Sequence, residues 1–152
     1  MSSQFNSVDD VLDFAIKNEQ DAHDLYMDLA SKVEHKAMKG VFEQFAQEEL
    51  GHKAKLLAVK AGGELKPAEG KIQDLKIADY TVDVEPHSGM TYQEALIVAM
   101  QAEKRAFMLY SDLATQTDDP TLTTLFLGLA QEEAKHKLRF EVEYDENIMI
   151  DN

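Results

Sequence analysis

Two copies of one short pattern carry the side chains of this sequence that are best suited to chemistry. The string Ala-Gln-Glu-Glu-x-x-His-Lys occurs at residues 46–53 and again at 130–137, which is 84 residues later. In each copy a glutamate precedes a histidine by three positions, as Glu49 and His52 or as Glu133 and His136. On a helix such residues lie on one face about one turn apart. Each copy therefore offers a carboxylate and an imidazole together, and both are ligands for metal ions.

A further glutamate lies 30 residues before each pair, Glu19 before Glu49 and Glu103 before Glu133. Glu19 and Glu103 both fall on the apolar stripe of an expected helix. Four ionised carboxylates in a protein interior would repel each other strongly, so protons or cations must neutralise them. Two divalent ions would balance the charge, and carboxylate oxygens with one imidazole per ion suit iron or manganese.

A single Glu-x-x-His pattern is more simply explained as a solvent-exposed helix face. The second copy, with its upstream glutamate at the same distance, favours a dinuclear metal site instead. The neighbouring acids Glu48 and Glu132 point to one side of the ligands. For these two we expect solvent exposure or contact with a ligand rather than metal binding.

Apolar residues at helical spacing predict the four helices that must position these side chains. Helix starts are indicated by Ser7 followed by an acid three residues later, by Thr91 followed by Glu94, and by Asp119 before Pro120. Gly62 and Gly63 mark the end of the second helix. The expected helices cover about residues 8–33, 36–61, 92–117 and 120–144.

The segment 62–90 between the two halves has no helical periodicity and contains prolines and glycines. A helix of about 26 residues is roughly 39 Å long, at about 1.5 Å per residue. A connection of this length can span that distance. We therefore expect a long crossover along the bundle, with apolar residues covering its side: Ile72, Leu75, Ile77 and Tyr80.

The two halves align without gaps at the 84-residue offset, which indicates a duplicated helical hairpin. Two hairpins joined by a long crossover predict an all-α four-helix bundle, with residues 1–152 forming one domain. Glu19 lies about as far from the end of its helix as Glu49 lies from the start of the next. Antiparallel packing therefore places both at the same height, and the same holds for Glu103 and Glu133. Four carboxylates and two imidazoles should meet at the middle of the bundle.

The ligand pattern resembles that of the ferritin-like carboxylate-bridged diiron proteins, most closely the diiron domain of rubrerythrins. This resemblance extends from Ser7 to about Tyr144. It implies two iron ions joined by an oxo or hydroxo bridge, with Glu49 and Glu133 shared between them. It also implies one terminal glutamate and one histidine for each ion: Glu19, Glu103, His52 and His136. Manganese would accept the same ligands.

Tyr26 and Tyr110 follow the two upstream glutamates by seven residues and lie on the same helix faces. They are candidate hydrogen-bond donors to the metal ligands. The alternative is that they are core aromatic residues whose hydroxyls are satisfied elsewhere.

The resemblance implies an oxidoreductase that reduces hydrogen peroxide or dioxygen, with an external electron donor such as a rubredoxin-like protein, and a homodimeric state. Rubrerythrins carry an additional glutamate where this chain has Ala106, and they append a cysteine-rich iron domain, whereas this chain has no cysteine. Bacterioferritin-like proteins have a haem-binding methionine where this chain has Leu50. Ferroxidation with iron storage or buffering is the alternative function. A dimanganese catalase and a purely structural bundle are further alternatives.

The net charge of −14 disfavours binding to nucleic acid or to an anionic membrane. The sequence has no apolar run of about 18 residues, and its first ten residues do not resemble a signal peptide. We therefore expect a cytoplasmic protein. The absence of cysteine excludes disulfides, thiolate metal sites, iron–sulfur clusters and a cysteine nucleophile within this chain.

Overall fold

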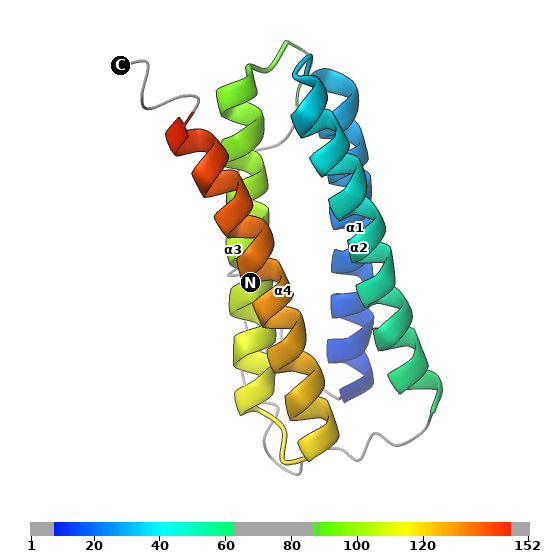
Figure 1. The fold of residues 1–152 in the computed structure, drawn as a ribbon. Helices are drawn as coiled ribbons and strands as arrows, with labels where there is room; N and C mark the ends of the chain where they lie inside the picture. The colour runs from blue at the N-terminus through cyan, green and yellow to red at the C-terminus, as the bar shows by residue number, and fades with distance from the viewer. Residues whose placement is uncertain (1–7, 63–86, 88, 147–152) are drawn as a thin grey trace, which may run out of the picture.

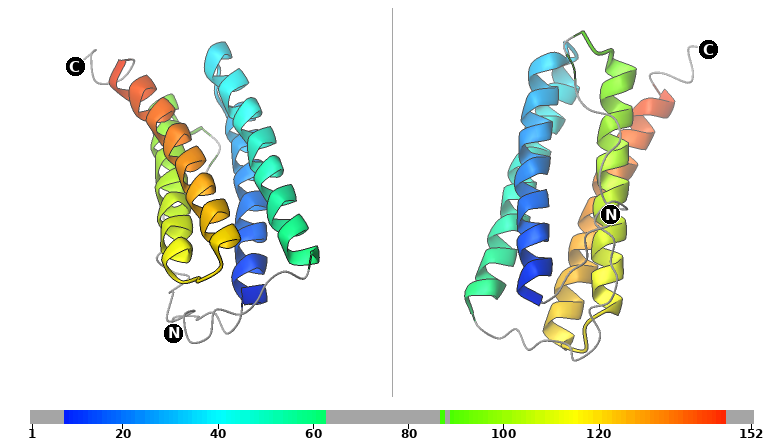
Figure 2. Two further views of the ribbon diagram at one scale, coloured as in Figure 1. Left: turned by 60° about the horizontal axis from the view of Figure 1, so that its bottom comes forward. Right: turned by 180° about the vertical axis from the view of Figure 1, so that it is seen from behind.

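A computed structural model describes residues 8–62, 87 and 89–146. It contains four helices, α1 (Val8–Lys32), α2 (Lys36–Ala61), α3 (Tyr92–Thr115) and α4 (Pro120–Tyr144). α1 pairs with α2 and α3 with α4 as two antiparallel hairpins (Figure 1), and the further views show the same pairing (Figure 2). The predicted all-α bundle of two helical hairpins is therefore confirmed.

The ends of α2 and α3 agree with the predicted crossover. α2 ends at the same end of the bundle as the start of α1, whereas α3 begins at the opposite end (Figure 1). The two helix ends that the crossover must join therefore lie at opposite ends of the bundle (Figure 1). Residues 63–86 lie outside the described residues, and with them the four side chains predicted to cover the bundle. Ser7 also lies outside the described residues.

Helices α3 and α4 begin at strong capping residues. Thr91 and Glu94 form a reciprocal capping box at the start of α3. At the start of α4, Oδ1 of Asp119 accepts hydrogen bonds from the amides of Thr121 and Leu122. These contacts satisfy amides that have no partner inside their helix. No helix in the described part of the chain is both long and apolar enough to cross a membrane.

α3 ends two residues earlier than the periodicity predicted. The amide of Gln116 donates to the carbonyl of Leu113 at 3.0 Å, which closes the last turn of the helix. The hydroxyl of Thr117 accepts the amide of Asp119 at 3.1 Å. Thr117 therefore stabilises the turn that presents the cap of α4, and it cannot also continue the preceding helix.

The apolar core has two parts, one toward each end of the bundle. One cluster contains residues such as Leu12, Leu113 and Phe126, and the other contains residues such as Leu29, Phe42 and Phe140. The six predicted ligands belong to neither cluster, although all of them are buried. A layer of charged side chains therefore divides an otherwise apolar interior.

Candidate metal centre

The structure brings the six predicted ligand side chains together in the middle of the bundle. They come from all four helices, and each is at most 5% exposed. Helix α1 supplies Glu19 and α3 supplies Glu103. The other four side chains come from the repeated motifs on α2 and α4: Glu49, His52, Glu133 and His136. Each helix pair therefore contributes one upstream glutamate and one Glu-x-x-His motif.

The six side chains form two overlapping groups. Glu19 and His52 group with Glu49 and Glu133, and within this group one ligand atom from each residue lies within 4.8 Å of the others. Glu103 and His136 group in the same way with the same two glutamates. Glu49 and Glu133 thus belong to both groups. This arrangement fits two metal ions that share two carboxylates.

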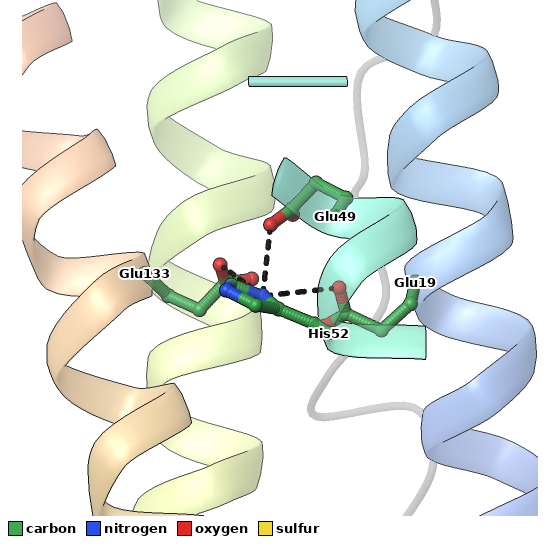
Figure 3. A group of neighbouring side chains, drawn as sticks. All are labelled: Glu19, Glu49, His52 and Glu133. Atoms are coloured by element: carbon green, nitrogen blue, oxygen red, sulfur yellow. Dashed lines mark ion pairs between the residues drawn. The ribbon is translucent and has the colours of Figure 1, made fainter. Parts of the chain in front are cut away.

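The surroundings of His52 illustrate the arrangement (Figure 3). Its Nδ1 atom lies 3.1 Å from Oε1 of Glu49, 3.3 Å from Oε2 of Glu19 and 3.4 Å from Oε1 of Glu133. One ring nitrogen carries at most one proton and cannot donate to three carboxylates. Figure 3 shows the three oxygens approaching that nitrogen from different sides, so the cluster has more acceptors than donors.

Unpaired polar atoms in the interior are concentrated at this cluster. Among the described residues, eight buried side-chain oxygen or nitrogen atoms have no hydrogen-bond partner, and seven of them belong to five of the six ligands. Both oxygens of Glu49 and of Glu133 are in this set. Leaving a buried polar group without a partner is unfavourable, by about 1–3 kcal/mol for each group. Cations bound between these atoms would satisfy them, so the residues present fit a pair of metal ions.

Without a cation the carboxylates keep protons at unusually high pH. Burial, followed by the charge of Glu133, raises the pKa of Glu49 to about 8. Burial and the charge of Glu49 raise the pKa of Glu19 to about 7, and burial raises that of Glu103 well above its ordinary range. Burial by itself lowers the pKa of His52, but the three adjacent carboxylates outweigh it and raise the pKa to about 12. Divalent ions would therefore replace protons that these buried side chains otherwise hold.

The two candidate tyrosines connect the hairpins at this layer. Tyr26 on α1 donates a hydrogen bond to Oε1 of Glu103 on α3, and Tyr110 on α3 donates to Oε1 of Glu19 on α1 at 2.6 Å. Burial raises the pKa of both phenols well above the ordinary value of 10, which keeps them protonated as donors. Each hydroxyl therefore orients the upstream glutamate of the other hairpin.

Sequence reasoning left the role of Glu48 open, and the structure places it in contact with His136. Oε1 of Glu48 lies 3.1 Å from Nε2 of that ring, on the side facing away from the carboxylates. The ring of Phe45 stacks on the same imidazole, with 3.8 Å between centroids. Glu132, the counterpart of Glu48, is 3.8 Å from Lys135 instead. Ala106 offers no oxygen, and neither group of potential ligands among the described residues includes a further glutamate in its place.

Known proteins resemble this chain in sequence and in fold. The family model for rubrerythrin matches residues 10–144. A protein of Thermotoga maritima proposed to be a ferritin-like diiron-carboxylate protein has the same fold, with a TM-score of 0.74 and 19% identity over 95% of this chain and 98% of that one. A hypothetical protein from Pyrococcus furiosus also matches, with a TM-score of 0.65 and 24% identity over 89% of this chain and 86% of that one.

No curated protein matches the sequence. The structural matches confirm the predicted ferritin-like fold. The family match covers most of the chain and includes all six clustered side chains. The chain therefore belongs to the rubrerythrin family.

Proposed function

We propose that this protein is a non-haem diiron oxidoreductase that reduces hydrogen peroxide or dioxygen with electrons from an external donor. The observation that carries the proposal is the buried cluster of four carboxylates and two imidazoles, whose unpaired atoms match two ions that share Glu49 and Glu133. Iron is favoured over other metals because the resemblance to rubrerythrins implies it and because a structurally similar protein is proposed to be a ferritin-like diiron-carboxylate protein. This ligand set also suits iron.

In this proposal Glu19 and His52 hold one ion, and Glu103 and His136 hold the other. Four residues around each ion leave room for a small oxidant. When bound, two ferrous ions supply the two electrons that, with two protons, convert hydrogen peroxide into two molecules of water. Tyr26 and Tyr110 hold the upstream glutamates by hydrogen bonds and keep their oxygens directed at the cluster.

The electrons must be replaced after each turnover. This chain has no cysteine, so it carries no thiolate-bound iron centre of its own. We therefore propose a separate donor, such as a rubredoxin-like protein. The rubredoxin-like character of this donor and the homodimeric state are proposed from the likeness to rubrerythrins.

The first test is elemental analysis of protein purified without added metal, which should find about two irons per chain, as the two ligand groups imply. Anaerobic diferrous protein is then mixed with peroxide in a stopped-flow spectrometer. Oxidation should be much faster than for the same iron in buffer, and Glu49→Ala should abolish this difference. Exposed Glu43 on the same helix supplies the matched control, Glu43→Ala. Rates no faster than those of free iron would refute the proposal.

Iron oxidation followed by storage or buffering is the second candidate, and the net charge of −14 favours it because an acidic surface attracts cations. Storage requires a closed shell of many copies, so light scattering distinguishes the two functions. A monomer or dimer would count against storage. Two manganese ions instead of iron would direct the assays to catalase activity.

A further inference from the structure

The two histidines of the site differ in what holds them on the side away from the carboxylates. Nδ1 of His136 lies 3.3 Å from Oε1 of Glu103, so this nitrogen faces the cluster. Its Nε2 faces Glu48 at 3.1 Å. When Nε2 carries the ring proton, it donates a hydrogen bond to this carboxylate. The lone pair of Nδ1 is then directed at the metal position.

Two more side chains fix this arrangement. Nε2 of Gln44, one turn earlier on α2, donates to Oε2 of Glu48 at 3.0 Å. One oxygen of Glu48 is thus held by Gln44 while the other accepts from His136. The ring of Phe45 lies nearly parallel to the imidazole, at an interplanar angle of 15°. His136 is therefore restrained both at its edge and on its face.

The second copy of the motif does not provide the equivalent restraints for His52. At the 84-residue offset, Gly128 stands in place of Gln44 and Leu129 in place of Phe45. Glycine has no side chain that could hold a carboxylate. Leucine has no ring to stack on an imidazole.

The carboxylate itself is retained in the second copy as Glu132, but it turns elsewhere. Its Oε1 lies 3.8 Å from Nζ of Lys135, where the first copy has Gly51. In the described part of the chain, the polar contacts of His52 all involve Nδ1. His52 therefore lacks the carboxylate that His136 has at Nε2.

We propose that Glu48 is a positioning residue for His136, and that the metal position of Glu103 and His136 binds its ion more tightly than the position of Glu19 and His52. A carboxylate that accepts from a ligand histidine fixes the ring and makes its other nitrogen a better donor. Losing such a partner typically lowers metal affinity by about 10–100-fold. The inference rests on the proposed metal site but not on the proposed reaction.

Metal affinity tests this inference when it is measured in variants that keep only one of the two ligand histidines. Co²⁺ is titrated into the metal-free protein and followed by calorimetry and visible absorbance. Two steps in the wild type are not sufficient, because the first ion repels the second. His52→Ala leaves only the position of His136 with its imidazole, and His136→Ala leaves only the position of His52. The first Co²⁺ should bind more tightly to the His52→Ala variant than to the His136→Ala variant.

Glu48→Ala is then added to each background. It should lower the affinity for the first Co²⁺ by about 10–100-fold in the His52→Ala protein and by less than about 2-fold in the His136→Ala protein. Glu132→Ala is the matched control, and it should have no such effect in either background. Glu48→Gln keeps the size and one acceptor oxygen, so its loss should be intermediate. This variant also keeps the test decisive if Glu48→Ala folds poorly.

Nuclear magnetic resonance of the Zn²⁺-loaded protein gives a second readout. The Nε2 proton of His136 should exchange slowly with solvent, and this protection should be lost in Glu48→Ala. Equal losses of affinity in both backgrounds, no loss in either, or the same loss from Glu132→Ala would overturn the inference. Wild-type protein that binds no Co²⁺ or iron at all would overturn the metal site and the proposed function as well.

Discussion

Replacing Glu49 with glutamine should stabilise the metal-free protein at neutral pH, although it removes a central carboxylate of the site. Glu49 is fully buried, and burial with the charge of Glu133 raises the pKa of its carboxyl from 4.5 to about 8. At about pH 7 this carboxyl is protonated in the folded protein but ionised in the unfolded chain. The difference amounts to about 1.4 kcal/mol for each pH unit above 4.5, or about 3 kcal/mol. Glutamine, which is never ionised, removes this penalty.

Denaturant unfolding of the two proteins at about pH 7, with a chelator present, measures the difference. Glu43→Gln is the matched control, because it removes the same charge from an exposed position of α2. Its effect should be within about 0.5 kcal/mol. The order should reverse when ferrous iron is added anaerobically. A metal that binds only the native state stabilises it by mass action, and Glu49→Gln lacks a carboxylate shared by both groups.

Two results would refute this reasoning. If metal-free Glu49→Gln is no more stable than Glu43→Gln, burial of the carboxyl does not oppose folding to the extent that its pKa implies. If Glu49→Gln gains as much stability from iron as the wild type does, Glu49 is not a ligand. The first result concerns the energetics of the empty cluster, and the second concerns its function.

Three further predictions concern the pH dependence of stability, a tyrosine beside the cluster and the cap of α4. The metal-free wild type should lose stability as the pH rises from about 4.5 to about 8. Over this range Glu49 and Glu133 bind protons in the folded state but not in the unfolded chain. Thermal melts that show rising stability would contradict this. Tyr110→Phe should lower the stability by about 1–3 kcal/mol, since it removes the 2.6 Å hydrogen bond to buried Glu19. Two Co²⁺ ions should still bind to this variant. A thermal melt that matches the wild type would be evidence against the role of this hydroxyl. Asp119→Ala should cost about 1 kcal/mol through loss of the α4 cap, whereas Asp119→Asn should retain most of the stability in the same denaturant assay; equal losses would argue against capping.

The repeat explains why the fold could be predicted from the sequence. Helical periodicity located four helices, and the end of α3 differed by two residues because the turn after it uses Thr117 as an acceptor. The equal offsets of Glu19 and Glu103 from their motifs predicted that all the carboxylates lie at one height. Their meeting required only that two antiparallel hairpins pack side by side, as they do in the structure (Figure 1).

Contacts between the hairpins were less accessible to sequence reasoning. The seven-residue spacing placed Tyr26 on the same face as Glu19, but its hydroxyl reaches Glu103 on the other hairpin. The contact of Glu48 with His136 also joins α2 to α4. Spacing along one helix cannot identify a partner on another, because the partner depends on the rotation of both helices. The pair of Gln44 and Glu48, four residues apart, is a sequence signal that could have distinguished Glu48 from Glu132, because Gly128 stands at the position equivalent to Gln44.

The charged layer links metal binding to the integrity of the bundle. It lies between two apolar clusters, each of which contains residues of both hairpins. In the metal-free state this layer holds protons and unpaired oxygens, so it opposes the packing that the clusters favour. Ions bound between Glu49 and Glu133 would turn it into a connection between α2 and α4. When a ligand is altered, the stability of the metal-loaded protein should therefore fall together with metal affinity.

Differences between the two halves lie beside the ligands rather than among them. All six ligands obey the repeat, whereas positions 44 and 128, 45 and 129, and 51 and 135 do not. A change of ligand would remove an oxygen or nitrogen from the cluster and leave the charge of the bound ions less well compensated. A change at the neighbouring positions alters only how firmly His136 or His52 is held. Duplication of the hairpin thus accounts for two metal positions, and divergence around the histidines is the route by which their affinities can separate while the ligand set stays intact.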